Sequence, residues 1–329
     1  MPGPFVHNID PILGSIGGLH LWWYGLSYAL GFLHLHLYLL RARRRLGLTG
    51  SEVYTLTFWI AIGVLIGGRA VEVSFDEWPF YREHLSLIPA YWLGGMATHG
   101  LLIGAAAGAT AFSLMYRKPF LELVDELVVP GAFLMGVGRI GNFIDGQIVG
   151  AVTDVGWGVQ FPDAVGVRHP VVLYDGLKNL LLIPYLSWVR RTNRTPGATA
   201  ARFVFWYAFA RLFIDLFRDY PTHRLALGTG QTLNIVMTLL GVVLIVRSHL
   251  RRLGRLAPRA VQGVGRVDPP ADAPAAWWRR GALAILLICC LTIPSNWTQD
   301  VPARYGKRHP GLEYSRIYPR LDTAPRRGP

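Results

Sequence analysis

Two arginines and a histidine lie inside or at the ends of apolar segments, where a charged side chain is costly. Arg139 lies in the run GRIGNF at residues 138–143, Arg211 lies in the middle of residues 203–217, and His99 lies near the start of another apolar segment. Intramembrane arginines are rare and usually functional, because an unpaired guanidinium costs several kcal/mol in hydrocarbon. A guanidinium also stays charged and binds two phosphate oxygens at once. These residues predict an anion site within a membrane protein.

Each of these residues also has a plain structural explanation. Arg139 could form an ion pair that caps a helix end, and His99 could be a hydrogen-bonded core histidine. Tyr207, Arg211 and Asp215 recur every four residues, so they share one helix face. An internal Arg211–Asp215 pair is therefore the alternative to phosphate binding, and the two roles can coexist.

The composition indicates a membrane protein. Of 329 residues, 52% are hydrophobic and only 16% are charged, yet the net charge is +13. The basic residues fall mainly between apolar segments. This distribution is typical of the loops of a membrane protein and not of a nucleic-acid-binding surface. Cys289 and Cys290 are adjacent in an apolar stretch, so they provide neither a disulfide framework nor a CxxC metal site. We expect no metal, no cofactor and no nucleic-acid partner.

Apolar segments near the length of a membrane span divide the chain, so the predicted fold is an all-α integral membrane protein. Seven segments form the predicted transmembrane core, at residues 20–40, 53–73, 94–115, 120–143, 170–189, 200–218 and 229–246. An eighth, weaker candidate at 281–297 carries no charge between residues 282 and 293, and tryptophans bracket it. We expect it to span as well.

Basic clusters follow the first, third, fifth and seventh segments, which predicts that these ends are cytoplasmic and that the N-terminus is extracytoplasmic. Residues 145–169 are rich in Gly and Val and predict a small extracytoplasmic cap of turns and short strands. The expected organisation is a membrane core at 1–250, a cytoplasmic linker at 251–280, the eighth segment at 281–297 and a basic tail at 298–329. The arginines of that tail argue against its translocation, so the topology of this end stays open.

Several motifs occur together in a fixed order. They are WYGL at 23–26, GGR at 67–69, GGMATHG at 94–100, GRIGNFIDGQIVG at 138–150, RHP at 168–170 with LYD at 173–175, Tyr207 with Arg211 and FR at 217–218, and GQ at 230–231. Together they resemble the bacterial prolipoprotein diacylglyceryl transferases over about residues 9–250. Residues 138–150 are called the signature segment below.

The resemblance implies a multi-pass enzyme of the bacterial inner membrane. Such enzymes transfer the diacylglyceryl group of phosphatidylglycerol to the lipobox cysteine of prolipoprotein signal peptides, forming a thioether and releasing glycerol phosphate. The expected partners are therefore phosphatidylglycerol, lipobox-containing precursors and membrane lipids. Because the substrate supplies the thiol, the enzyme's own cysteines need not be catalytic.

The resemblance and the chemistry together give the candidate site residues. A thiol is mostly protonated at neutral pH, so His99 is the expected proton acceptor. Arg139 and Arg211 are expected to stabilise the charge that grows on the leaving phosphate. The expected substrate-binding residues are Tyr24, Arg69, Gly138, Asn142, Asp145, Gln147, Gly150, Tyr207 and Asp215. Tyr24 could instead be an aromatic residue of the membrane-interface belt. Arg69 could have no substrate role and simply extend its charged end to the membrane interface.

Three positions depart from the family pattern. The pattern favours Asn and Glu where this chain has Asp145 and Gln147, and the longer Glu at Asp215. Gln147 can hydrogen-bond but cannot balance an arginine or take a proton. A divergent paralogue with another acceptor, or without catalysis, is therefore one alternative. A lipid or anion transporter is another, although the two halves show no convincing repeat.

Overall fold

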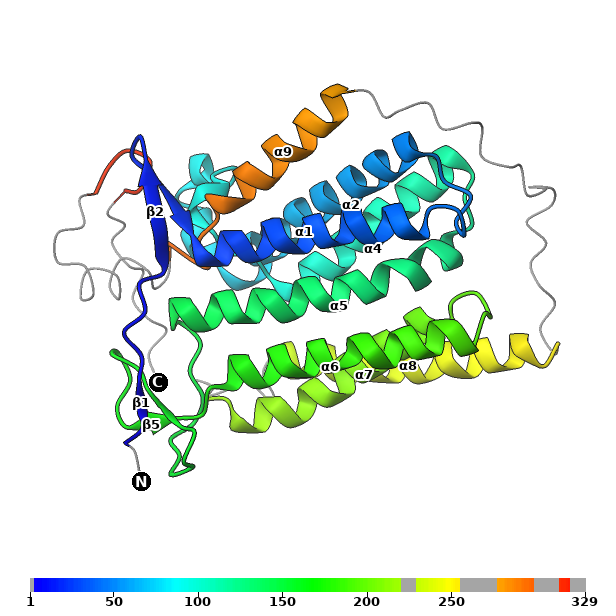
Figure 1. Cartoon of the computed structure of the whole chain (residues 1–329). Helices are drawn as coiled ribbons and strands as arrows, with labels where there is room; N and C mark the ends of the chain where they lie inside the picture. The colour runs from blue at the N-terminus through cyan, green and yellow to red at the C-terminus, as the bar shows by residue number, and fades with distance from the viewer. Residues whose placement is uncertain (1–2, 220–228, 255–276, 299–313, 320–329) are drawn as a thin grey trace.

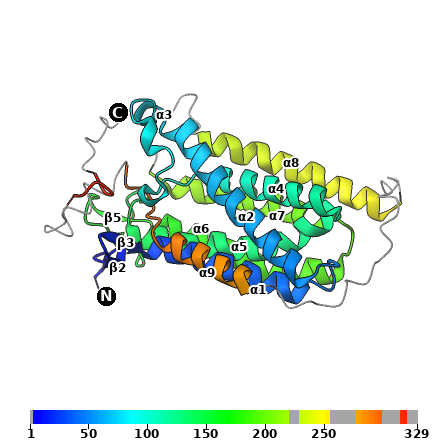
Figure 2. The same ribbon diagram turned by 90° about the horizontal axis from the view of Figure 1, so that it is seen from above.

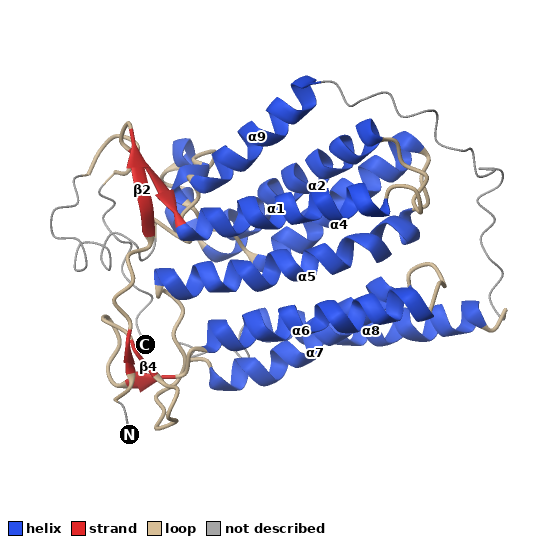
Figure 3. Ribbon diagram, in the orientation of Figure 1, coloured by secondary structure: helices blue, strands red, loops and turns tan. Residues whose placement is uncertain are grey.

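The computed structural model describes residues 3–219, 229–254, 277–298 and 314–319. Long helices run roughly along one direction, and short strands gather at one end of them (Figure 1). Figure 3 shows that the strands are a small part of a mainly helical fold. The chain is therefore mostly helical, as predicted.

A helix occupies each of the seven segments predicted for the core. These helices are α1 (Trp23–Ala42), α2 (Gly50–Val71), α4 (Thr98–Tyr116), α5 (Phe120–Asp145), α6 (Val171–Thr192), α7 (Ala198–Ile214) and α8 (Thr229–Arg252). Short helical turns follow α2 at Glu72–Asp76 (η1), Trp78–Tyr81 (α3), Leu85–Leu87 (η2) and Tyr91–Leu93 (η3), and Asp215–Phe217 (η4) follows α7.

Three helices within the described ranges are long and apolar enough to cross a membrane. They are Gly50–Asp76, which joins α2 to η1, Thr98–Tyr116 and Gly230–Arg252. Among the other core helices, α7 has 17 residues, fewer than the shortest of these three. The membrane character of the chain thus rests on the apolar helices, and a seven-span core stays a proposal.

The prediction for the eighth segment was wrong in its bounds. The helix there is α9 (Trp277–Leu291), which ends well before residue 297. Pro294 follows shortly after this end, and a proline disfavours helical backbone at the residue before it. Trp297 is not a helix-end anchor at a membrane interface, because it is fully buried with Trp22 and Tyr318.

The bounds of the predicted linker also change. Because α8 runs to Arg252 and α9 begins at Trp277, both ends of the predicted linker 251–280 are helical. Residues 255–276 lie outside the described residues, as does most of the predicted tail 298–329.

Two small sheets lie at the end of the bundle near the N-terminus (Figures 1 and 3). Segment 145–169 contains β4 (Val159–Gln160) and β5 (Val167–Arg168), and β1 (Phe5–Val6) pairs with β4 in parallel. A separate antiparallel hairpin, β2 (Ile12–Ile16) with β3 (Leu19–Trp22), leads directly into α1. The two sheets therefore lie at the end of the bundle where the chain enters α1.

Close helix packing positions the segments that carry the candidate site. The helix pairs that pack together most extensively are α2 with α4, α1 with α5, α5 with α6, and α7 with α8 (Figures 1 and 2). A Cβ added at Gly104 would lie 1.9 Å from the carbonyl oxygen of Gly63, so only glycine permits this approach of α4 to α2. A Cβ at Gly141 would lie 2.8 Å from Tyr24 Cα, which sets the approach of α5 to α1.

Ion pairs and a helix cap hold the opposite end of the bundle. Glu126 is fully buried and pairs with Arg190 at 2.9 Å and Arg45 at 3.3 Å. Asp125 accepts hydrogen bonds from the backbone N–H groups of Gly197 and Ala200, both at 2.8 Å, and so caps the start of α7. This end carries several of the basic clusters that the sequence predicts to be cytoplasmic.

Candidate functional site

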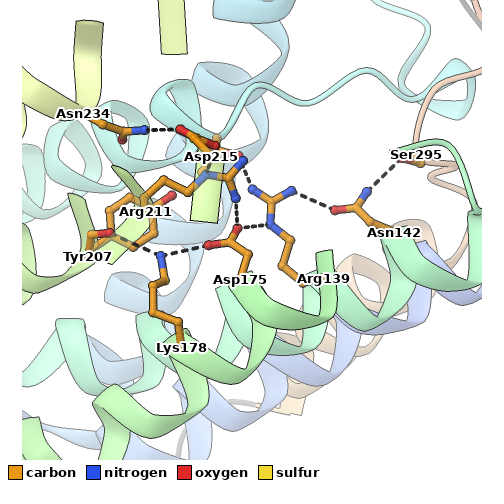
Figure 4. A network of polar contacts seen from close by, with 10 residues as sticks. Arg139, Asn142, Asp175, Lys178, Tyr207, Arg211, Asp215, Asn234 and Ser295 are labelled. Carbon is orange, nitrogen blue, oxygen red and sulfur yellow. Dashed lines mark hydrogen bonds and ion pairs between the residues drawn. The ribbon is translucent and has the colours of Figure 1, made fainter. Parts of the chain in front are cut away.

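Arg139 and Arg211 meet at one carboxylate. Arg139 lies on α5, Arg211 on α7, and Asp175 lies between them on α6 (Figure 4). The same oxygen, Asp175 Oδ2, accepts from Arg139 Nε at 2.6 Å and pairs with Arg211 Nη1. Asp175 is fully buried and Arg211 is 8% exposed. Guanidinium groups from separate parts of the chain thus converge on one spot near the strand end of the bundle.

Lys178 and Asp215 extend this cluster. Lys178 Nζ lies 2.9 Å from the other oxygen of Asp175 and 3.9 Å from the centre of the Tyr207 ring. Arg211 Nε lies 3.0 Å from Asp215 Oδ1. These cations and carboxylates, all within the described residues, leave one net positive charge when every group is ionised. The cluster can therefore attract one further anion.

The structure contains the internal pair that the sequence offered for Arg211 and Asp215, and phosphate binding by these residues stays a prediction. The pair of Arg211 with Asp215 is present, and Asn234 on α8 donates to Asp215 Oδ2 at 3.3 Å. Tyr207 is 2% exposed, and its backbone carbonyl accepts from Lys178 Nζ at 3.3 Å. Figure 4 shows these side chains around one centre.

The remaining donors of Arg139 orient it toward α4 and the end of α5. Arg139 Nη1 donates to Asn142 Oδ1 at 3.0 Å, and Nη2 donates to Thr98 Oγ1 at 3.1 Å. Asn142 in turn donates from Nδ2 to Ser295 Oγ at 2.9 Å. A guanidinium has five N–H donors, and these contacts with that to Asp175 use three of them. Arg139 is thus held in place, and two of its N–H groups have no partner among the residues that the structure describes.

His99 lies in the first turn of α4, beside Thr98. Thr98 accepts from Arg139, and His99 interacts electrostatically with Arg211, Asp76 and Asp215. Its Nε2 atom is buried and makes no hydrogen bond with the residues that the structure describes. The structure therefore brings His99 to the arginine cluster with one ring nitrogen that a substrate could use.

Tyr24 and Gly138 line the α1–α5 interface near Arg139. Tyr24 is 6% exposed, and its hydroxyl lies 3.1 Å from that of Tyr28. Ser27 Oγ is the nearest atom to a Cβ added at Gly138, at 4.0 Å. A buried Tyr24 differs from an aromatic residue in an interface belt, which would face lipid headgroups.

The end of the signature segment contacts a distant part of the chain. Asp145 is 4% exposed and accepts from the backbone N–H of Ser295 at 3.2 Å, and Gln147 Nε2 donates to the carbonyl of Asn296 at 3.0 Å. Gly150 pairs with the backbone of His169, and a Cβ there would lie 2.5 Å from the His169 carbonyl oxygen. Close backbone packing explains this glycine without a ligand.

Arg69 lies apart from the cluster and donates hydrogen bonds to the loop before α4. Its guanidinium donates to the carbonyls of Ile88 at 3.0 Å, Leu87 at 2.9 Å and Gly94, and it lies over the Tyr81 ring. Arg69 is 3% exposed. The structure therefore gives Arg69 a role in holding this loop and does not bring it to Arg139 or Arg211.

Some residues of the site were missed by the sequence prediction. Asp175 was noted only as part of the LYD motif, although it joins the two arginines, and Lys178, Asn234 and Ser295 were not considered. The three-residue spacing of Asp175 and Lys178, on a segment predicted to span the membrane, could have identified these two residues, because charges within a span need partners. No group of three or more His, Cys, Asp or Glu side chains in the described ranges could hold a metal ion.

Comparison with known proteins gives one consistent result. Residues 11–247 match the family model described as prolipoprotein diacylglyceryl transferase. A protein of Geobacter sulfurreducens named phosphatidylglycerol–prolipoprotein diacylglyceryl transferase is 36% identical over 256 residues, which cover 75% of this chain and 98% of that protein. Proteins of the same name from Mannheimia succiniciproducens and Legionella pneumophila are 36% and 35% identical, and cover 74% and 71% of this chain and 95% of each relative.

Proposed function

This chain belongs to the prolipoprotein diacylglyceryl transferase family, and we propose that it transfers the diacylglyceryl group of phosphatidylglycerol to the lipobox cysteine of prolipoproteins. It is an enzyme, a transferase of the membrane. Its substrates are phosphatidylglycerol and the precursor protein.

The reaction exchanges one bond to the glyceryl carbon for another. The cysteine sulfur forms a carbon–sulfur bond to that carbon, and the bond from carbon to the phosphate oxygen breaks. The thiol proton goes to a base, and glycerol phosphate leaves with the bonding electrons. The leaving phosphate monoester carries more negative charge than the diester did, so donors aimed at it favour the transition state.

The observation that carries the proposal is the meeting of Arg139 and Arg211 at Asp175. A site for the leaving phosphate needs fixed cationic donors in a buried place, and these two guanidiniums already point to a common spot. The net positive charge of the cluster would attract a phosphate. Asp175 and Asp215 then hold the two arginines together and oriented when no lipid is bound.

His99 is the proposed base. His99 follows Thr98, which accepts from Arg139, and its buried Nε2 makes no hydrogen bond within the described residues, which supports a role next to the proposed phosphate site. The neutral imidazole is the form that accepts a proton.

The remaining substrate contacts follow from position. Tyr24, Gly138 and Asn142 lie near Arg139 and would contact the glyceryl or headgroup part of the lipid. Tyr207 and Asp215 would support the Arg211 side. Asp145, Gln147 and Gly150 shape the end of the site toward the strands, and Arg69 supports it through its loop.

The proposed setting is the bacterial inner membrane, with seven helices spanning and the N-terminus outside. The site lies toward the strand end of the bundle, while Glu126 and the basic clusters lie at the other end. A lipid headgroup and the cysteine of an exported precursor would both be found on the extracytoplasmic side.

The test is thioether formation by the purified protein in vesicles of phosphatidylglycerol with a lipobox peptide. We expect product with the wild type and none with a Cys→Ser peptide, and a loss of about 100-fold or more with Arg139→Gln. Arg82→Gln is the matched control, because Arg82 is 59% exposed and pairs only loosely, at 3.6 Å, with Glu83. Transfer that is equal in the wild type and Arg139→Gln, or lipid that moves between leaflets without thioether formation, would contradict the proposal.

A further inference from the structure

The loop after α9, residues 292–298, reaches the candidate site from outside the part of the chain that matches the family. The family match ends at residue 247, and α9 packs against α1 before this loop begins. The loop is called the C-terminal loop below.

The first contact of the C-terminal loop is with the amide that orients Arg139. Asn142 Oδ1 accepts from Arg139 Nη1 at 3.0 Å, while Asn142 Nδ2 donates to Ser295 Oγ at 2.9 Å. Because a guanidinium only donates, Arg139 itself requires Asn142 to present its oxygen, and the amide NH₂ group then faces the other way. Ser295 Oγ accepts from that NH₂ group, so it holds Asn142 in the position from which Asn142 accepts from Arg139.

A second set of contacts joins the loop to the signature segment. Asp145 accepts from the Ser295 N–H at 3.2 Å, and Gln147 donates to the Asn296 carbonyl at 3.0 Å. These are the two signature positions at which this chain departs from the family pattern. A carboxylate at residue 147 could not donate to that carbonyl. The amide of Gln147 is therefore the side chain that can bind the C-terminal loop.

A third set of contacts anchors the loop to the segment that leads into α4. The backbone of Gly95 donates to the Ser295 carbonyl, and that of Trp297 donates to the Leu93 carbonyl, both at 2.8 Å. The Trp297 side chain is fully buried against Trp22 and Tyr318. The loop therefore bridges the end of α5, which carries Arg139, and the start of α4, which carries His99.

The C-terminal loop also supplies partners to a buried acid. Glu77 is 3% exposed and accepts from Asn296 Nδ2 and from Thr298 Oγ1, the latter at 2.7 Å. Burial raises the pKa of Glu77, and these hydrogen bonds act in the opposite direction. Without the loop, Glu77 would lose both of these partners in a buried place, which would loosen the turn that follows α2.

We propose that Ser295 and Asn296 are positioning residues of the transfer reaction, Ser295 acting through Asn142 on Arg139 and Asn296 through Gln147. This inference rests on the proposed function. The C-terminal loop is then a built-in part of the site in this chain, supplied in cis by a segment beyond the family core.

The test compares kcat and KM for phosphatidylglycerol in the full-length protein with a lipobox peptide as acceptor. Ser295→Ala removes the acceptor of Asn142, and we expect kcat to fall by about tenfold with KM within about twofold, since one hydrogen bond to a charged network is lost. Ser295→Thr keeps the hydroxyl and should restore most of kcat. Thr192→Val is the matched control, because the Thr192 hydroxyl donates to the Trp188 carbonyl of its own helix, at the end of α6 away from Asp175.

Gln147→Glu tests the second bridge independently, because it places a carboxylate oxygen opposite the Asn296 carbonyl. We expect a similar loss of kcat. The inference is overturned if Ser295→Ala and Gln147→Glu keep kcat within about twofold of an active wild type, or if Ser295→Thr is as slow as Ser295→Ala. A wild type without transferase activity would instead overturn the proposed function, and this inference with it.

Discussion

Replacing Asp175 by Asn removes the charge that joins the two arginines while it keeps the shape of the side chain. In the native chain one Asp175 oxygen faces Arg139 and Arg211, and the other faces Lys178 at 2.9 Å. An Asn side chain has one acceptor and one NH₂ group, so the NH₂ group must face a cation whichever way the amide turns. The substitution therefore leaves at least one buried cation against a donor.

The size of the effect follows from the burial of this carboxylate. Asp175 is fully buried, and breaking a buried ion pair by removing one partner costs about 3–5 kcal/mol. For a domain of this size, 1 kcal/mol shifts the unfolding midpoint by about 2–4 °C, so Asp175→Asn should lower the midpoint by about 6–20 °C. The cluster also gains one net positive charge, so we expect kcat to fall while KM for phosphatidylglycerol stays the same or falls.

The assay is thermal unfolding in one detergent at one scan rate, together with thioether formation. A fixed scan rate is needed because membrane proteins often unfold irreversibly. Asp154→Asn is the control, because Asp154 is an exposed carboxylate. A midpoint within about 2 °C of the wild type, or an unchanged kcat, would refute the view that Asp175 holds the arginine cluster together.

Three further predictions concern other parts of the molecule. His99→Gln should lower kcat by about 10²–10⁴-fold near neutral pH, with partial recovery as the pH approaches the thiol pKa of about 8.5; a flat, wild-type profile would remove His99 as the base. Gly104→Ala would bring a Cβ to 1.9 Å from the Gly63 carbonyl and should lower the unfolding midpoint by about 2–12 °C, whereas Gly131→Ala, which has open space, should not. Glu126→Gln removes the partner of Arg45 and Arg190 and should destabilise by about 1–3 kcal/mol without changing kcat, because it lies at the opposite end of the bundle; a loss of kcat at equal stability would count against this.

The helices could be predicted from the sequence because each needs only a long apolar run. All seven core segments are helical in the structure, with bounds that differ by a few residues. The end of the eighth helix was misjudged because its tryptophans were interpreted as interface anchors. Pro294 carried the better signal, since a proline shortly after an apolar run indicates a helix end.

The partners of the arginines could be predicted only in part. The Arg211–Asp215 pair is local, one turn apart on a helix, and the sequence already indicated it. Arg139 meets Asp175 across 36 residues, and Asn142 meets Ser295 across 153 residues. Such contacts depend on how helices pack, and neither spacing nor hydropathy encodes them. The roles of the site residues in catalysis stay predictions.

The most direct test of the central claim, that Arg139 and Arg211 together bind the leaving phosphate, is the rate of transfer in Arg139→Lys, Arg211→Lys and the double variant. Lysine keeps the charge beside Asp175 but loses the planar fork, so each single variant should lose about 100-fold or more in kcat. Because both side chains act on one phosphate, the double variant should lose far less than the product of the two single losses. Single variants that keep half of the wild-type kcat, or losses that multiply fully, would contradict the claim.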